Sequence, residues 1–390
     1  MSTDNHHNGK SKTIKINRLF LIGNGFDISL GLKTKYTDFL LWFLKVEITN
    51  ALNSGITNRP LKRSQNYNNL NRKSIKGYKK NLVFEVIIEN TGYRITDTDI
   101  LNINNFEELS TFREMYDVLI KYAPTSLMNK LYESTAKNWV DIENIYFNLL
   151  KNIIDNKGKN YTEAIISINQ ELTEIIAYLK KYLTSLDVKM EKSNAEPHFK
   201  IFNEKLKNED FLDLKKILEI KIEPIIDVGT NYFLNFNYTN SISEVLKHYD
   251  YENIQNFIHG NLSDEEIIFG FGDEMDKFYK EIEELNDNEL FKHIKSFHYF
   301  KTPNQRKLQT FLNSGLYQVC VYGHSCGLSD RVMLNEIFEH ENCKSIKIYY
   351  YSDDDFTTKT MEISRHFNSN QLMRKKIVNK SEDCIIPQLK

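Results

Sequence analysis

Two side chains suited to proton transfer and hydroxyl binding follow short apolar runs in the second half of the chain. His259 precedes Gly260, which leaves room beside an imidazole that titrates near neutral pH. Asn237 follows Phe236, and its neutral amide offers both a hydrogen-bond donor and an acceptor. A satisfied buried histidine and a loop-capping asparagine are the structural alternatives. The residue types therefore permit this chemistry without requiring it.

A small-residue turn follows the first apolar run of the chain. Residues 19–22 end at Gly23-Asn24-Gly25, and residues 26–31 have the character of the first turns of a helix. A strand–Gly-x-Gly–helix unit presents backbone N–H groups to a pyrophosphate, which a Cβ would keep at a distance. Ile28 stands where a dehydrogenase fingerprint has its third glycine, so a purely structural turn is the alternative. The pattern predicts nucleotide binding through Gly23, Asn24, Gly25 and Phe26.

Asp27 lies in the first turn of the helix that follows this turn. A carboxylate at such a position stabilises a helix N-terminus by about 0.3–1 kcal/mol, which is the structural alternative. Its negative charge would repel a pyrophosphate. We therefore expect Asp27 to face a ribose hydroxyl, a glycosidic carbon or His259.

A second small-residue turn, Gly323-His324-Ser325, follows the apolar residues 319–322. Asp330 comes shortly afterwards and precedes a helical stretch at 331–340. The favoured interpretation of Asp330 is an N-cap of that helix, and the alternative is a residue that fixes a loop of the binding site.

Strands and helices alternate along much of the chain, which favours a doubly wound, mostly parallel α/β sheet of the Rossmann-like type. Ligands of such sheets bind beyond the carboxyl ends of the strands. The motifs described above all lie at such ends, so we expect them to share one site. The first helix is predicted at about 26–47. The predicted strands are 17–22, 233–236, 256–259, 319–322 and 346–351, with a further short apolar run at 267–272.

The 390 residues are enough for a sheet domain with a large insertion. Residues 48–84 contain no acidic residue, and a solvated insertion is favoured there over a basic surface for a nucleic acid or an acidic partner. Residues 82–88 are β-like and are predicted to form a hairpin with 92–96. The predicted organisation is a disordered tail (1–14), a sheet domain (15–50 and 223–390), a basic and polar insertion (51–105) and a helical insertion (106–222).

The composition argues against several functional classes. A net charge of −2 and a pI near 6.6 give no general attraction to nucleic acid or to anionic membranes. No apolar run approaches the ~20 residues of a membrane-spanning helix, and the first residues lack the apolar core of a signal peptide. The 4 cysteines form no Cys-x-x-Cys pair, which fits a reduced compartment and neither a disulfide framework nor a zinc ribbon. We therefore expect a cytoplasmic protein without a bound metal.

The string IGNGFDISLGLKTKYTDFL, residues 22–40, resembles the opening motif of the AbiH family. These bacterial proteins are linked to abortive phage infection and look like distant relatives of the sirtuin-type NAD-binding fold. Lys33 departs from the motif, which usually has proline there. Four further blocks resemble the family in the same order: Asn138–Glu143, Phe236–Thr239, Ile258–Gly260 and Gly323–Asp330.

The resemblance implies a role for each candidate residue. Asn237 would hold the nicotinamide ribose and the attacking water. His259 would accept a proton from a ribose hydroxyl or from water as the N-glycosidic bond breaks. Asp27 would stabilise an oxocarbenium-like transition state. The late turn, Gly323, His324 and Ser325, would take the adenosine ribose or the phosphates. Further candidates are Tyr238, Asp330 and Glu143, which is preferred over Asp141 as the helical residue that reaches the cleft, while Trp139 is assigned to the core.

The resemblance thus implies an anti-phage effector that binds NAD as its substrate and hydrolyses it to nicotinamide and ADP-ribose. Deacylation is not expected, because sirtuin deacylases carry a zinc ribbon that this chain lacks. An activating partner protein or homo-oligomerisation is implied, since an enzyme that drains NAD must stay silent before infection. The alternative is a module that binds NAD or another nucleotide signal without turnover and controls a partner. A nuclease acting through residues 59–80 ranks last, because no paired-carboxylate metal motif accompanies them.

Overall fold

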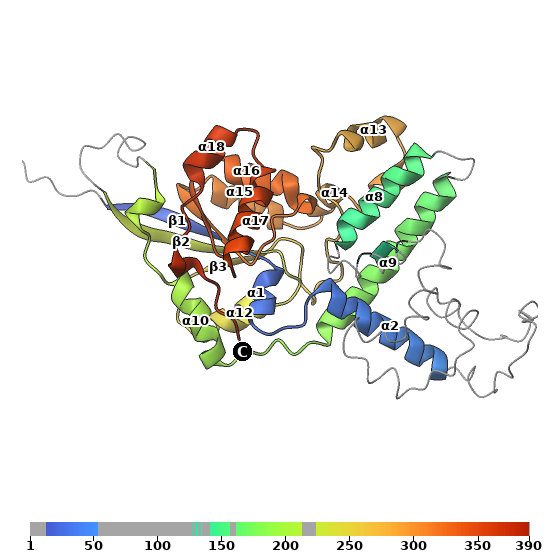
Figure 1. Ribbon diagram of the computed structural model, residues 1–390, viewed down its shortest axis with the longest axis horizontal. Helices are drawn as coiled ribbons and strands as arrows, with labels where there is room; N and C mark the ends of the chain where they lie inside the picture. Colours follow the sequence, from blue (N-terminus) through green and yellow to red (C-terminus); the bar gives the residue numbers. More distant parts are fainter. Residues whose placement is uncertain are drawn as a thin grey trace, which may run out of the picture. The chain divides into compact units, whose positions relative to one another are not determined.

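The structure is a computed structural model that describes residues 13–53, 127, 130, 131, 134, 141–156, 161–212 and 224–389. These residues belong to two compact units, one drawn from residues 1–32 and 186–390 and the other from residues 33–185. The sheet lies in the first unit (Figure 1).

A five-stranded sheet forms the centre of the first unit, with the strand order β3-β2-β1-β4-β5. Every neighbouring pair of strands is parallel, which confirms the predicted doubly wound α/β class. The order reverses beside β1, where the chain crosses from β3 to β4, and such a switch point is where open parallel sheets bind ligands. The strands are β1 (Thr13–Ile22), β2 (Ile225–Asn235), β3 (Ile254–Phe257), β4 (Tyr317–Tyr322) and β5 (Cys343–Ile348).

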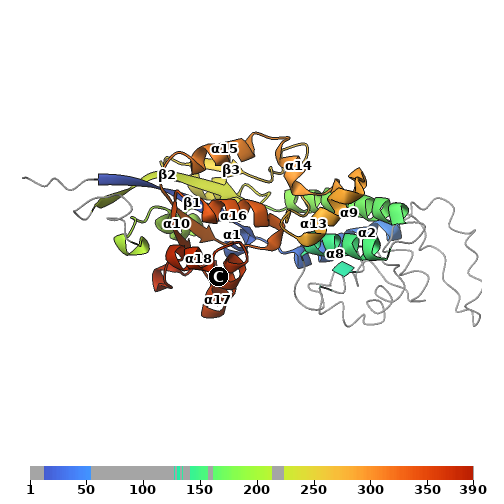
Figure 2. The ribbon, with the colours of Figure 1, turned by 90° about the horizontal axis from the view of Figure 1, so that it is seen from above.

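Helices cover both faces of this sheet, so its strands read as continuous apolar runs (Figures 1 and 2). In β1, Leu19 and Leu21 face a core shared with α15 (Asn304–Leu312) and α16 (Arg331–Glu339). Phe20 and Ile22 point to the opposite face. The core on that face is shared with α10 (Lys192–Phe202) and α12 (Ser241–Leu246).

The first helix is two helices, α1 (Asn24–Ser29) and α2 (Tyr36–Asn53), so the predicted single helix at 26–47 is wrong. Gly31 has a φ of 79°, which a residue with a Cβ rarely adopts. The N–H of Leu32 donates to the Asp27 carbonyl and that of Gly31 to the Ile28 carbonyl, which is a Schellman motif. Gly31, one residue beyond the C-cap Leu30, thus ends α1 about one turn after Asp27.

The unit boundaries differ from the predicted domain boundaries. Residues 33–50 belong to the second unit, where α2 packs on α9 (Tyr161–Thr184) through ring contacts such as Phe43 with Tyr178. Residues 186–212 belong to the first unit, because α10 buries its apolar side chains against the sheet. β1 begins at Thr13, so the last two residues of the predicted tail are strand.

The second unit contains α2, α9 and α8 (Ile142–Asp155) among the described residues. α8 and α9 lie within the predicted helical insertion, and their residues Leu150 and Leu172 are fully buried. The predicted hairpin at 82–96, the basic stretch 59–80 and Trp139 lie outside the described residues.

Shorter elements complete the first unit. The apolar run at 267–272 forms only an isolated parallel bridge, between Phe271 and Ile294. Within the described ranges, no helix combines the length and apolar character needed to cross a membrane. The remaining elements are η5 (Asn208–Asp210), α13 (Lys277–Leu285), η6 (Asn288–Phe291), α14 (Lys295–Tyr299), η7 (Leu328–Asp330), α17 (Asp353–Ser364), α18 (Asn370–Lys376) and η8 (Glu382–Cys384).

Candidate functional site

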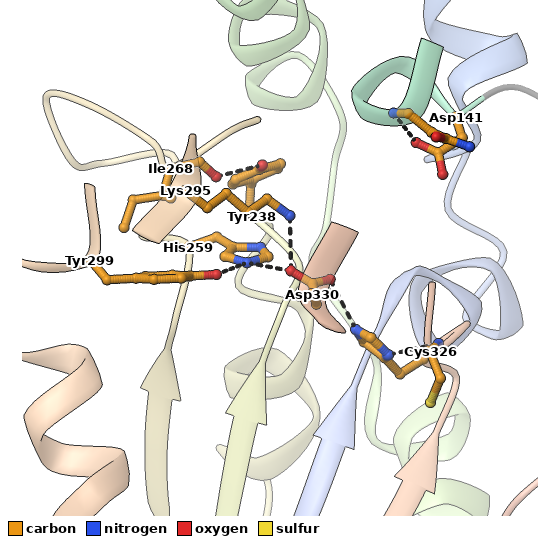
Figure 3. A network of polar contacts seen from close by, with 10 residues as sticks. Asp141, Tyr238, His259, Ile268, Lys295, Tyr299, Cys326 and Asp330 are labelled. Atoms are coloured by element: carbon orange, nitrogen blue, oxygen red, sulfur yellow. Dashed lines mark hydrogen bonds and ion pairs between the residues drawn. The ribbon is translucent and has the colours of Figure 1, made fainter. Parts of the chain in front are cut away.

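The segments that follow β1, β2, β3 and β4 meet at the carboxyl edge of the sheet, toward which the strand arrows point in Figure 3. Ile22 forms a bridge with Gly323, which joins the turns after β1 and β4. The Asn237 amide donates to the Gly23 carbonyl at 3.1 Å, which joins β1 to β2. His259 follows β3 by two residues. The sequence correctly located this edge.

The glycines of the first turn are required by the packing of one backbone against another. A Cβ on Gly23 would lie 2.5 Å from His324 Cα, and one on Gly25 would lie 2.8 Å from the Gly323 carbonyl oxygen. The N–H of Gly25 donates to the Gly323 carbonyl, and the N–H of Phe26 donates to the Gly23 carbonyl. Both N–H groups therefore already have partners. The predicted pyrophosphate contact at this turn stays a prediction.

The side chains of this turn lie in different environments. Asn24 is exposed, whereas the Phe26 ring is fully buried and packs edge-on against Tyr322 at a centroid distance of 5.8 Å. In the second turn, Ser325 is exposed and His324 is buried. Phe26 is thus a core side chain, and only Asn24 and Ser325 present their side chains to solvent here.

Asp27 is buried and receives three hydrogen bonds from neutral donors of one segment, residues 237–241. The Asn237 amide donates to Oδ1 at 3.0 Å and the Thr239 hydroxyl to Oδ2 at 2.6 Å, while the Ser241 hydroxyl also donates to Oδ1. Burial raises the pKa of Asp27 to about 6, although these hydrogen bonds from Ser241, Thr239 and Asn237 act to lower it. Its carboxylate thus faces the segment after β2, of which the sequence had placed Asn237 and Tyr238 in the site, and both of its oxygens contact that segment rather than the expected His259.

The orientation of the Asn237 amide follows from these contacts. Its Nδ2 lies near two acceptors, the Gly23 carbonyl and the Asp27 carboxylate, which identifies that atom as the donor. The backbone N–H of Asn237 donates to Asn235 Oδ1, which fixes the turn. Asn237 Oδ1 accepts no hydrogen bond from the described part of the chain. The amide is held by its donor side and leaves an acceptor available.

Asp330 lies at the centre of a second network, shown in Figure 3. Lys295 Nζ donates to its Oδ1 at 2.8 Å, and His259 Nε2 lies 3.2 Å from the same oxygen. His324 Nε2 lies 3.7 Å from Oδ2. Burial alone would raise the pKa of Asp330, but Lys295, His259 and His324 outweigh it and hold that pKa well below its ordinary value.

The prediction that Asp330 caps the helix that follows it is thus confirmed for its position and not for its side chain. Asp330 does occupy the N-cap position of α16, but its side chain makes no capping hydrogen bond. Lys295 and the two imidazoles contact the carboxylate in place of the helix N–H groups. A charged partner stabilises a buried carboxylate more than a capping hydrogen bond would stabilise the helix end.

His259 contacts the same carboxylate oxygen as Lys295. Its Nε2 contacts Asp330 and the Tyr299 hydroxyl at 3.1 Å, so this nitrogen carries the hydrogen that the carboxylate attracts. Burial lowers the pKa of His259, and Lys295 lowers it further, while Asp330 acts to raise it. The ring is flanked by Phe236 and Tyr238, whose hydroxyl donates to the Ile268 carbonyl at 3.0 Å.

Most of the chain matches a known protein family. Residues 19–352 match the family described as Bacteriophage abortive infection AbiH. The chain belongs to the AbiH family. No match to a curated protein or to a solved structure was found. Family membership places the chain among the proteins of bacteriophage abortive infection, and the AbiH match includes every site residue described so far.

Several members of the candidate site were not foreseen. Thr239 and Ser241 follow Asn237 at every second position, a hydroxyl pattern that the sequence shows but that was not used. Lys295 and Tyr299 come from α14 and give no local signal, because the fold alone brings them to Asp330 and His259. Glu143 is buried in the first turn of α8, in the second unit, while Asp141 caps that helix by accepting from the Asn144 N–H.

Proposed function

We propose that this AbiH protein is an abortive-infection effector that binds NAD and hydrolyses the bond between nicotinamide and ribose. The observation that supports this most is the Asn237 amide, whose donor is fixed on Asp27 and Gly23 while its Oδ1 is available. An acceptor held in this way suits a ribose hydroxyl or a water molecule, both of which donate hydrogen bonds.

His259 supplies a second acceptor, in the segment that follows the neighbouring strand β3. Its Nε2 is directed to Asp330, so its Nδ1 is the atom that can take a proton. In the proposed reaction, water adds to C1′ as the C1′–N bond breaks. The bonding pair returns to the cationic nicotinamide ring, which leaves neutral, and His259 Nδ1 takes the proton that the water loses.

Asp27 acts on this reaction through Asn237. Both of its oxygens are directed to donors of the 237–241 segment, so it is a positioning residue in this proposal. The pyrophosphate and the adenosine ribose would lie over the two turns at the switch point, Gly23–Phe26 and Gly323–Ser325, where Asn24 and Ser325 are exposed. The enzyme would be silent before infection, and an activating partner or self-association would switch it on.

The test is the fate of NAD. The purified chain is incubated with NAD alone and with lysate of phage-infected cells, and nicotinamide and ADP-ribose are separated and quantified. We expect nicotinamide and ADP-ribose in equal amounts, and we expect Asn237→Ala to form neither product. Asn313→Ala serves as the matched control, because Asn313 is exposed and its amide donates only to the Gln309 carbonyl.

Two results would overturn the proposal. If NAD binds by calorimetry and survives in both incubations, the chain is a nucleotide-binding module without turnover. If Asn237→Ala hydrolyses NAD at the rate of Asn313→Ala, the Asn237 amide takes no part in the reaction.

A further inference from the structure

His259 and His324 both contact the Asp330 carboxylate, but they differ in whether their second ring nitrogen already accepts a hydrogen bond. The backbone N–H of Cys326 donates to His324 Nδ1 at 2.9 Å, so the neutral His324 ring carries its hydrogen on Nε2. His324 therefore has no acceptor to offer. His259 Nδ1, in contrast, makes no hydrogen bond within the described residues.

The backbone around Cys326 maintains this difference. Cys326 has a φ of 55°, a left-handed conformation that is uncommon for a residue with a Cβ. Its N–H is directed to His324, and its carbonyl accepts from His366 Nε2 at 2.7 Å. A conformation of this kind persists where the surroundings determine it, and it occurs often at functional sites.

Lys295 balances the charge of Asp330. A lone carboxylate beside His259 would favour the imidazolium, in which both nitrogens carry hydrogen and neither can accept a proton. Lys295 Nζ binds the oxygen that His259 also contacts, so the pair next to the imidazole is close to neutral. The groups that face His259 are Lys295 and Tyr299 from α14, Asp330 before α16, His324 after β4, and the rings of Phe236 and Tyr238.

We infer that Asp330 and Lys295 hold His259 as the neutral base of the site, with Nδ1 as its proton-accepting atom, and that His324 supports Asp330 without acting as a base. Lys295, Asp330 and His324 are positioning residues. The inference rests on the proposed NAD hydrolysis for the reaction that the base serves, but the state of the ring is independent of that activity.

Nuclear magnetic resonance of the full chain labelled with [¹⁵N]histidine tests the inference directly. Long-range ¹H–¹⁵N correlations report which ring nitrogen carries hydrogen, and a pH titration gives the pKa. We expect His259 to be the Nε2–H tautomer. Lys295→Met should raise the pKa of His259 and Asp330→Asn should lower it, while His324→Gln should leave the His259 tautomer unchanged.

Lys347→Met is the matched control. Lys347 and Asp210 form another buried pair of the same unit, 3.1 Å apart, with side chains 6% and 5% exposed. Its loss should leave the tautomer and the pKa of His259 unchanged. The inference is overturned if wild-type His259 carries hydrogen on Nδ1, or if Lys295→Met and Lys347→Met shift its pKa equally.

The activity of the same variants separates the two proposals. With NAD turnover, the acid limb of kcat/KM should move to higher pH in Lys295→Met and not in Lys347→Met, and His259→Gln should lose turnover. An unmoved limb in Lys295→Met overturns the role of Lys295. A chain that hydrolyses no NAD but shows the expected tautomer and shifts removes the proposed function and supports the arrangement of the ring.

Discussion

Asp27 and Asp330 are buried carboxylates at the same edge of one sheet, and their surroundings shift their pKa values in opposite directions. Neutral donors surround Asp27, namely an amide and two hydroxyls, and its pKa is raised to about 6. A lysine and two histidines surround Asp330, and its pKa is held well below the ordinary value.

The difference shows what each kind of partner can do for a buried charge. Hydrogen bonds from neutral donors offset only part of the free energy of hydration that a carboxylate loses on burial. A cation in contact with the carboxylate offsets more of it. Environments that separate the pKa values of nearby carboxylates are a feature of acid–base sites. Near neutral pH, the Asp330 network holds a firm negative charge, while Asp27 can gain a proton in mild acid.

Removal of the base served by Asp330 should have the largest effect. We expect His259→Ala to lower the rate of NAD hydrolysis by ~10²–10⁴-fold, the usual contribution of a general base. The melting temperature should change little, and His248→Ala is the control, because His248 contacts the Met190 carbonyl elsewhere in the unit. Full activity of His259→Ala would remove this residue from the mechanism.

Loss of the ion pair at Asp330 should lower the free energy of unfolding more than loss of a neutral hydrogen bond to Asp27. Asp330→Ala leaves Lys295 buried without this counter-charge, so we expect a loss of about 3–5 kcal/mol in the free energy of unfolding. The double variant Asp330→Ala with Lys295→Met should recover part of this loss in urea unfolding. A double variant no more stable than Asp330→Ala would show that charge imbalance is not the cause.

The pH dependence of stability should separate the two carboxylates. Because the pKa of Asp27 is raised from 3.8 to about 6 in the folded state, its contribution to stability is fully present below pH 3.8 and is lost as the pH rises through 6. The difference is on the order of 3 kcal/mol at about 1.4 kcal/mol per pH unit. Asp27→Asn should lack this fall in urea unfolding between pH 4 and pH 7. An identical slope in wild type and variant would contradict the assignment.

Removal of a single hydroxyl that donates to Asp27 should have the smallest effect. Thr239→Val removes one donor to Asp27 at constant shape, which should cost about 1 kcal/mol at pH 7. The pKa of Asp27 should rise further, as measured by ¹³C NMR of its carboxyl group. Thr310→Val is the control, because the Thr310 hydroxyl donates to the Arg306 carbonyl on an exposed helix face. A pKa that falls in Thr239→Val would show that this hydroxyl does not stabilise the charged form.

The sequence by itself located the five strands and the edge at which the candidate site lies, although β2 begins at Ile225 and not at the predicted residue 233. Strands covered on both faces are apolar at consecutive positions, so β1, β4 and β5 stand out without any knowledge of their partners. In a parallel sheet all carboxyl ends lie at one edge, which is why Asn237, His259 and Gly323 could be assigned to one place.

The tertiary structure alone decided which groups pair within that edge. Asp27 lies 210 residues from Asn237, and Lys295 lies 35 residues from Asp330, so no local pattern links them. The strand order and the path of α14 bring these groups together. The two carboxylates look alike in the sequence, and their opposite charge states follow from partners that only the folded chain provides, because a buried pKa depends on its neighbours in space.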